Sequence, residues 1–146
     1  MKNFLIAIFL ISFSFGFSQK VKLKKDKVII DDVEIYNYTS EGTITSFSTL
    51  SDSKEFISVI STFYEAPNPA RSQPNGHNFP ATIRKAIFTV KFLESGKELT
   101  TDLGHKGIIK AVFTSKLVDD NGKIDDEKLN IFINKYNNEN LKYKIN

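Results

Sequence analysis

The chain contains no cysteine, and this absence excludes several kinds of protein. Without a thiol there is no disulfide, no thiolate metal site and no lipid-bearing cysteine behind an export signal. The fold must therefore be held by its hydrophobic core. Residues 19–146 form a segment of 128 residues, long enough for one domain with such a core. A chain of this size buries roughly two thirds of the surface that it exposes when unfolded.

Long apolar runs are also missing, apart from one near the N-terminus. Residues 1–3 give a short positive start, residues 4–17 are uncharged and apolar, and Gly16 and Ser18 supply small side chains before Gln19. This run of fourteen residues, which includes Ser12 and Ser14, is shorter than the roughly 20 apolar residues that a membrane helix needs. The pattern predicts a signal peptide over residues 1–18 and, after its cleavage, no membrane span. Export without cysteine favours a bacterial protein that is secreted or periplasmic.

A strong excess of one charge is absent as well. After removal of residues 1–18, 19 basic and 17 acidic side chains remain, a net charge of +2. This charge is too small and too dispersed to indicate nucleic-acid binding. One lysine cluster allows two interpretations, contact with anionic lipid or polysaccharide and a charged edge strand that resists aggregation; we favour the second. The cluster consists of Lys20, Lys22, Lys24, Lys25 and Lys27.

The order of hydrophobic patterns predicts an α+β fold. Segments rich in β-branched and aromatic residues come first, and a hairpin turn is expected at Asp31-Asp32. The spacing then changes to that of two amphipathic helices, one with Asp102 as its candidate N-cap and one capped by Asp125. We therefore expect a single domain over residues 19–146, an antiparallel sheet of four or five strands with two C-terminal helices packed on one face. Residues 141–145 are expected as an edge strand or a frayed tail. The expected strands are residues 28–30, 33–36, 43–48, 56–64 and 83–93.

Signatures of catalysis and of metal binding are missing. There is no cysteine nucleophile and no Gly-x-Ser-x-Gly motif. The two histidines, His77 and His105, lack the spacing of a zinc site. His105 lies near the start of a predicted helix, a position that favours the binding of an anion. The sequence thus predicts no catalytic residue, no metal ligand and no cofactor.

Residues 117–128 partly match a calcium-binding EF-hand loop. Aligned on Gly122, the segment places Asp119, Asn121 and Asp125 at ligand positions. The two anchoring positions, however, hold Leu117 and Lys128, and a lysine places an ammonium group beside the cation. We favour a tight turn at Asn121-Gly122, followed by a helix cap at Asp125.

Residues 65–82 form a long connection between two predicted strands, and this segment contains all four prolines of the chain. Loops longer than about 12 to 15 residues without structure of their own are often functional or disordered. Its polar side chains are candidates for contact with a ligand, and its aromatic ring is a candidate for stacking on a sugar or a partner. An unconstrained hairpin tip is the alternative. The candidate ligand-binding residues are Arg71, Gln73, Asn75, His77, Asn78 and Phe79.

The sequence resembles small secreted proteins of flavobacteria and their relatives. The resemblance is carried by residues 24–34, by residues 120–136 and by the end of the signal, Phe17-Ser18-Gln19. It implies no activity and transfers no functional residue. Two classes of function remain. One is a non-enzymatic module that binds a protein, a glycan or a small ligand through residues 65–82 or an exposed sheet face, and the other is a small secreted hydrolase whose groups meet only in the fold. A structural protein without a ligand is also compatible with the sequence. The absence of any catalytic motif favours the binding module.

Overall fold

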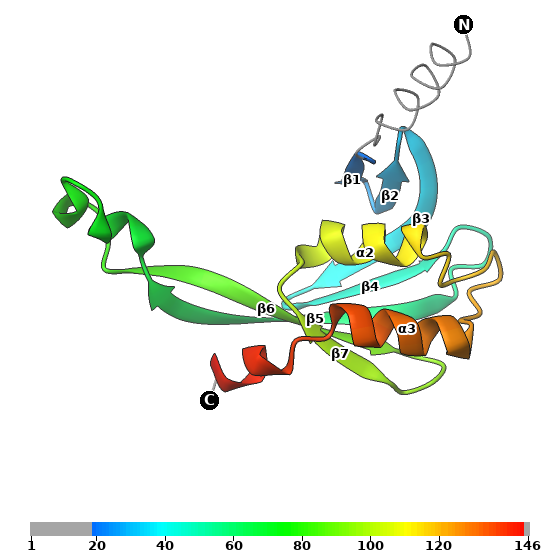
Figure 1. Cartoon of the computed structure of the whole chain (residues 1–146). Helices are drawn as coiled ribbons and strands as arrows, with labels where there is room; N and C mark the ends of the chain where they lie inside the picture. Colours follow the sequence, from blue (N-terminus) through cyan, green and yellow to red (C-terminus); the bar gives the residue numbers. More distant parts are fainter. Residues whose placement is uncertain (1–18, 145–146) are drawn as a thin grey trace, which may run out of the picture.

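The computed structural model describes residues 19–144, so the predicted signal peptide lies outside the described residues. Seven strands form one antiparallel sheet in which every strand lies beside its neighbours in sequence (Figure 1). The strands are β1 (Val21–Lys24), β2 (Lys27–Ile30), β3 (Val33–Glu41), β4 (Ile44–Thr49), β5 (Glu55–Pro67), β6 (Thr82–Phe92) and β7 (Glu98–Thr101).

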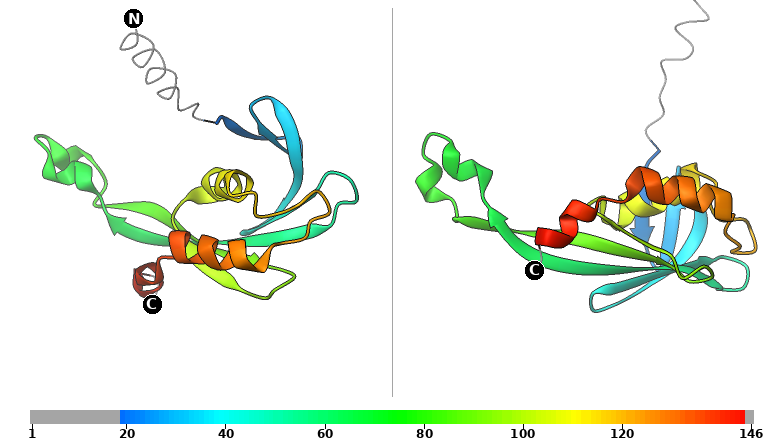
Figure 2. Two further views of the ribbon diagram at one scale, coloured as in Figure 1. Left: turned by 45° about the vertical axis from the view of Figure 1, so that its right-hand side comes forward. Right: turned by 60° about the horizontal axis from the view of Figure 1, so that its bottom comes forward.

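The predicted fold, four or five strands with two helices on one face, was wrong. The sheet has seven strands and curls into a half-barrel around the helices (Figure 2). The two additional strands, β1 and β7, have four residues each and form the two edges of the sheet. β1 lies within the lysine cluster that was expected as a charged edge strand, although its bounds were not predicted. β7 was not predicted, because half of its residues are threonine and it has too little apolar alternation.

Two α-helices, α2 (Gly104–Thr114) and α3 (Asp126–Tyr136), share one hydrophobic core with the sheet. The Asp125 carboxylate accepts a hydrogen bond from the Lys128 backbone N–H, which confirms the predicted N-cap of α3. α2 begins after Leu103 without a side-chain cap, although Asp102 was the expected one. The Phe132 ring of α3 packs edge-on against Phe92 of β6, with ring centroids 6.0 Å apart.

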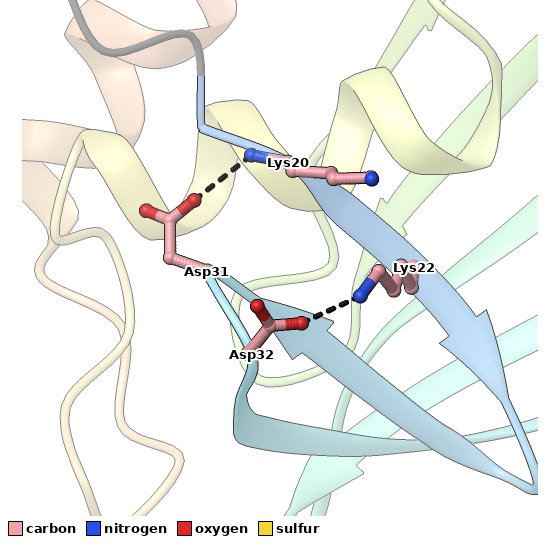
Figure 3. A network of polar contacts seen from close by, with 4 residues as sticks. All are labelled: Lys20, Lys22, Asp31 and Asp32. Carbon is pink, nitrogen blue, oxygen red and sulfur yellow. Dashed lines mark hydrogen bonds and ion pairs between the residues drawn. The ribbon is translucent and has the colours of Figure 1, made fainter.

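A hydrogen bond and an ion pair connect the β1 edge to the turn between β2 and β3 (Figure 3). Asp31 and Asp32 have φ values of 52° and 67°, the left-handed pair of a two-residue hairpin turn. The Asp31 carboxylate accepts a hydrogen bond from the backbone N–H of Lys20 at 3.0 Å. The Lys22 ammonium donates to Asp32 at 2.5 Å and, chiefly through this bond, lowers the pKa of that carboxyl. The charged edge strand favoured from the sequence is confirmed.

The β7 edge is closed by the end of α3. The Thr100 N–H donates to the Asn137 side-chain oxygen, and the Asn138 N–H donates to the Thr100 carbonyl, both at 2.8 Å. Two asparagines thus take the hydrogen-bonding place of a further strand. The chain continues as the 3₁₀-helix η3 (Glu139–Lys144), with Leu141 buried, so the expected edge strand or tail at residues 141–145 is absent from residues 141–144.

Candidate functional site

β5 and β6 extend beyond the rest of the sheet as a two-stranded arm, which we define as residues 62–87. β4 pairs with β5 as far as Ile60, and β7 pairs with β6 as far as Phe88. β5 and β6 stay paired to Pro67 and Thr82. At roughly 3.3 Å per residue, the strands project about 20 Å past their neighbours. The arm points away from the body of the molecule, the remaining described residues (Figure 1).

The buried face of the sheet changes between the body and the arm. In the body, the inner face carries the fully buried pair Val59 and Val90. Along the same face of the arm, Phe63 and Arg84 are exposed. On the opposite face, the outer face, Ala66 and Ile87 are buried. Burial in the arm is therefore the reverse of that in the body.

η3 lies beside the outer face of the arm. Lys144 of η3 lines an open hollow of about 430 Å³ together with Tyr64, Ala66 and Lys85 of the arm. Leu141 of η3 is buried although it lies outside the main core. Within residues 19–144, no helix lies beside the inner face of the arm. The side chains of Phe63 and Arg84 on this face are therefore accessible to a partner.

An exposed aromatic ring and an arginine meet on the inner face. The Arg84 guanidinium lies 4.0 Å from the centroid of the Phe63 ring, and 47% of Phe63 is exposed. This is the geometry of a cation–π contact. Glu65 lies opposite Arg84 in the register. The chain has only two arginines, Arg71 and Arg84, and both lie on the arm.

The tip of the arm, residues 68–81, is more ordered than the predicted connection. The strands extend to Pro67 and start again at Thr82, and the 3₁₀-helices η1 (Pro69–Ser72) and η2 (Gly76–Asn78) fill the space between them. The Asn68 side chain accepts from the Ala70 N–H and donates to the Pro80 carbonyl, both at 3.0 Å. Gly76 is buried, and a Cβ there would lie 2.2 Å from the Arg71 carbonyl oxygen. The tip therefore has a defined, closely packed backbone.

The structure brings the six predicted ligand-binding residues together on this tip, and all six are exposed. Two of them shape the tip: Arg71 donates to the Phe79 carbonyl at 3.0 Å, and Asn75 takes a left-handed φ of 65°. Phe79 is 47% exposed. The other three, Gln73, His77 and Asn78, present exposed polar side chains.

Sequence reasoning missed Phe63 and Arg84 as candidates. Both lie in strands that it assigned to an ordinary sheet, where one face is expected to be buried. The restriction of both arginines to residues 71–84 is the one signal that would have drawn attention to this segment.

A second polar site lies where the arm leaves the body. The Ser61 hydroxyl is 3.4 Å from Nε2 of His105 at the start of α2, and the imidazole packs edge-on against Phe88 at 5.0 Å. Burial lowers the pKa of His105, which favours the neutral imidazole. Among residues 19–144, no carboxylate hydrogen-bonds to the His105 ring. The pair thus has a nucleophile and a base, but lacks the third group that orients a catalytic histidine.

The segment between α2 and α3 has the favoured turn in place of an EF-hand loop. One Asp119 oxygen accepts from the backbone N–H groups of Asn121 and Lys123, both at 2.9 Å. Of the predicted pair Asn121-Gly122, only Gly122 is left-handed, with φ at 75°. An open hollow of about 440 Å³ lies here, and its lining includes Lys116, Lys123 and Lys128. A lysine-lined hollow whose aspartates bind backbone amides is unsuited to a cation.

In the part of the chain that the structure describes, no group of three or more His, Asp or Glu side chains is placed to hold a metal ion. Within the same residues, no helix combines the length and the apolar character needed to cross a membrane. Comparisons with protein families, with curated proteins and with solved structures find no significant match to this chain. Functional inference therefore depends on the geometry alone.

Proposed function

We propose that this chain is a secreted or periplasmic interaction protein that contacts a partner protein through its arm. The observation that carries the proposal is the uncovered inner face of the arm, with Phe63 and Arg84 stacked in solvent. A two-stranded ribbon is only marginally stable by itself in water. An exposed ribbon of this length is therefore well suited to being covered by another molecule.

The side chains on the arm support a protein partner. Aromatic residues and arginine are the types most enriched among residues that dominate binding energy. The arm presents both in two places, Phe63 with Arg84 on the inner face and Phe79 with Arg71 at the tip. The ordered tip also reduces the conformational entropy that binding would cost. A glycan stacked on Phe79 is the other partner class, and the experiment below distinguishes the two.

The test compares two double variants of the exported chain. Phe63→Ala/Phe79→Ala removes both exposed rings of the arm, whereas Val33→Ala/Ile131→Ala removes two exposed apolar side chains of the body. Each immobilised protein is exposed to the periplasmic and culture fractions of its host, with and without prior protease treatment. We expect the arm variant to lose a protease-sensitive partner that the body variant retains. Equal retention by both variants would contradict the proposal, and a protease-resistant partner would indicate a glycan.

A second candidate function, hydrolysis, is favoured by the Ser61–His105 contact alone. Ser61 would act as the nucleophile and neutral His105 as the base that accepts its proton. Ser61 is buried, however, and the histidine has no orienting carboxylate among the described residues. A panel of activated acyl esters tests this function: a slow hydrolysis that Ser61→Ala abolishes would support it. Turnover equal to that of the variant would exclude Ser61 as a nucleophile.

A further inference from the structure

We propose that the open edge of β6 in the arm, residues 82–86, binds an extended acidic segment of a partner protein as an additional strand. The inference deepens the proposed function, on which it rests, by naming the binding mode and the partner's chemistry. Strand addition of this kind gains affinity from main-chain hydrogen bonds and specificity from alternate side chains.

The hydrogen bonds of the body show which backbone groups of β6 point outward. Thr100 of β7 directs its N–H and C=O toward Asn137 and Asn138, hence away from β6. Its register partner Thr89 must therefore direct its own groups toward β5. The next residues along β6 alternate, and the Phe92 N–H indeed bonds on the β7 side, to the Lys97 carbonyl at 2.9 Å.

The same alternation continues into the arm. The N–H and C=O groups of Thr82, Arg84 and Ala86 therefore point away from β5, toward the open edge. β7 covers the edge only as far as Phe88, because the chain turns into α2 after Thr101. Within residues 19–144, no strand occupies the row beyond β7. An incoming strand would continue the line of β7 along the arm.

The other edge of the arm, on β5, is less suitable. The Ser61 N–H donates to the Thr43 carbonyl at 2.8 Å, so the outward residues of β5 in the arm are Phe63, Glu65 and Pro67. Pro67 has no N–H to donate, and proline is a common means of protecting an edge strand. Glu65 adds a negative charge. The β6 edge, by contrast, has every donor and acceptor that a further strand needs.

The charge of the arm favours an acidic segment over a second copy of this chain. Within residues 62–87 the only acidic residue is Glu65, whereas Arg71, Arg84 and Lys85 are basic. Lys144 of η3 adds a further positive charge beside Lys85 at the hollow. Two β6 edges paired with each other would bring Arg84 and Lys85 against the same residues of the second copy, and like charges placed opposite destabilise a strand pair.

The test titrates the ¹⁵N-labelled exported chain with a synthetic six-residue peptide, acetyl-Thr-Val-Glu-Glu-Val-Thr-amide. Paired antiparallel to residues 82–87, its two glutamates lie opposite Lys85 and Arg84. We expect saturable shifts of the arm amides and at least threefold slower hydrogen exchange at Arg84 and Ala86. A peptide with Lys-Lys in place of Glu-Glu should bind at least tenfold more weakly. Equal binding of the two peptides would overturn the proposal.

Two further measurements address the strand geometry. Ala86→Pro removes an outward N–H and leaves the β5–β6 ladder intact, so it should weaken peptide binding at least fivefold. N-methylation of the second, fourth and sixth peptide residues, whose N–H groups would face β6, should abolish binding, whereas methylation of the other three should not. The methylated peptides need no change in the protein, so they decide the question even where Ala86→Pro disturbs the arm. Equal loss with both sets of methyl groups would contradict strand addition.

The last measurements test the charge of the β6 edge and the self-association of the chain. Lys85→Glu should abolish binding of the acidic peptide, whereas Lys91→Glu, the same change farther along β6 in the body, should have little effect.

Sedimentation tests whether a second copy of the chain occupies the edge instead. Concentration-dependent dimerisation that is lost in Ala86→Pro would show that it does, and would overturn the proposal of an acidic segment. Partner capture lost with Phe63→Ala/Phe79→Ala but kept with Ala86→Pro would preserve the proposed function and overturn the binding mode. Capture unaffected by either would contradict the proposed function itself.

Discussion

The body and the arm are built from the same two strands but bury opposite faces. In the body, Val59 and Val90 of the inner face are fully buried beneath the helices. A few residues farther along that face, Phe63 is 47% exposed, and burial has moved to Ala66 and Ile87 on the outer face. The strands' alternation continues unchanged. The difference therefore comes from what lies against each face: α2 and α3 pack on the inner face of the body, whereas η3 lies beside the outer face of the arm.

The largest contrast is expected from one aromatic truncation in each region. Phe92→Ala removes a fully buried ring that packs against Phe132 and should lower the free energy of unfolding by about 3–5 kcal/mol. Phe63→Ala removes an exposed ring and a cation–π contact and should cost less than about 1 kcal/mol. Urea unfolding followed by far-ultraviolet circular dichroism measures both. A comparable loss for Phe63→Ala would show that the arm's inner face is structural and not free for binding.

The next effect concerns the closed edge of the body. Asn137→Ala leaves the Thr100 N–H without its acceptor and should destabilise the protein by about 1–2 kcal/mol. Asn138→Ala is the matched control, because Asn138 contributes its backbone N–H to Thr100 and retains it in the variant. The same unfolding measurement separates the two. An equal loss of stability in the two variants would mean that the side-chain hydrogen bond from Thr100 to Asn137 does not itself stabilise the β7 edge.

A smaller, local effect is expected at the tip of the arm. Gly76→Ala places a Cβ 2.2 Å from the Arg71 carbonyl, so the tip must rearrange, yet the body should unfold at nearly the same urea concentration. Gly42→Ala is a suitable control because nothing lies within 4 Å of the added Cβ, although its φ of +59° remains unfavourable for alanine. Proteolysis of the folded protein should become faster within residues 68–81 for Gly76→Ala alone. Cleavage unchanged from the parent chain would show that the tip is already open in solution.

The same comparison explains how much could be predicted from the sequence. Asp125 and the spacing after it were enough for α3, and the alternation from residue 83 onward was enough for β6, because both signals are local. The half-barrel and the edge strand β7 were missed, since four residues of which half are threonine carry too little periodicity. The edge strand β1 was indicated only by its lysines, without its bounds. The tip residues could be predicted as candidates because they lie in a long connection between two predicted strands. The exposure of Phe63, however, depends on where α2 and α3 lie, because these helices bury the inner face in the body only. The Ser61–His105 contact joins residues 44 positions apart. No local sequence pattern therefore predicts either feature.

The smallest effect concerns the junction of body and arm, where His105 packs beside Phe88 and Ser61. Burial holds the pKa of His105 below its usual 6.5. The unfolded chain therefore binds more protons than the folded protein as the pH falls below about 6.5, and stability decreases there. Above that pH the imidazole is neutral in both states and has no such effect. His105→Gln should reduce the difference in urea midpoint between pH 7.5 and pH 5.5, whereas His77→Gln, at the exposed tip, should leave it unchanged. If both variants keep the parent's difference, then His105 is as well solvated in the folded protein as in the unfolded chain, and the junction is open to water like the arm rather than closed like the body.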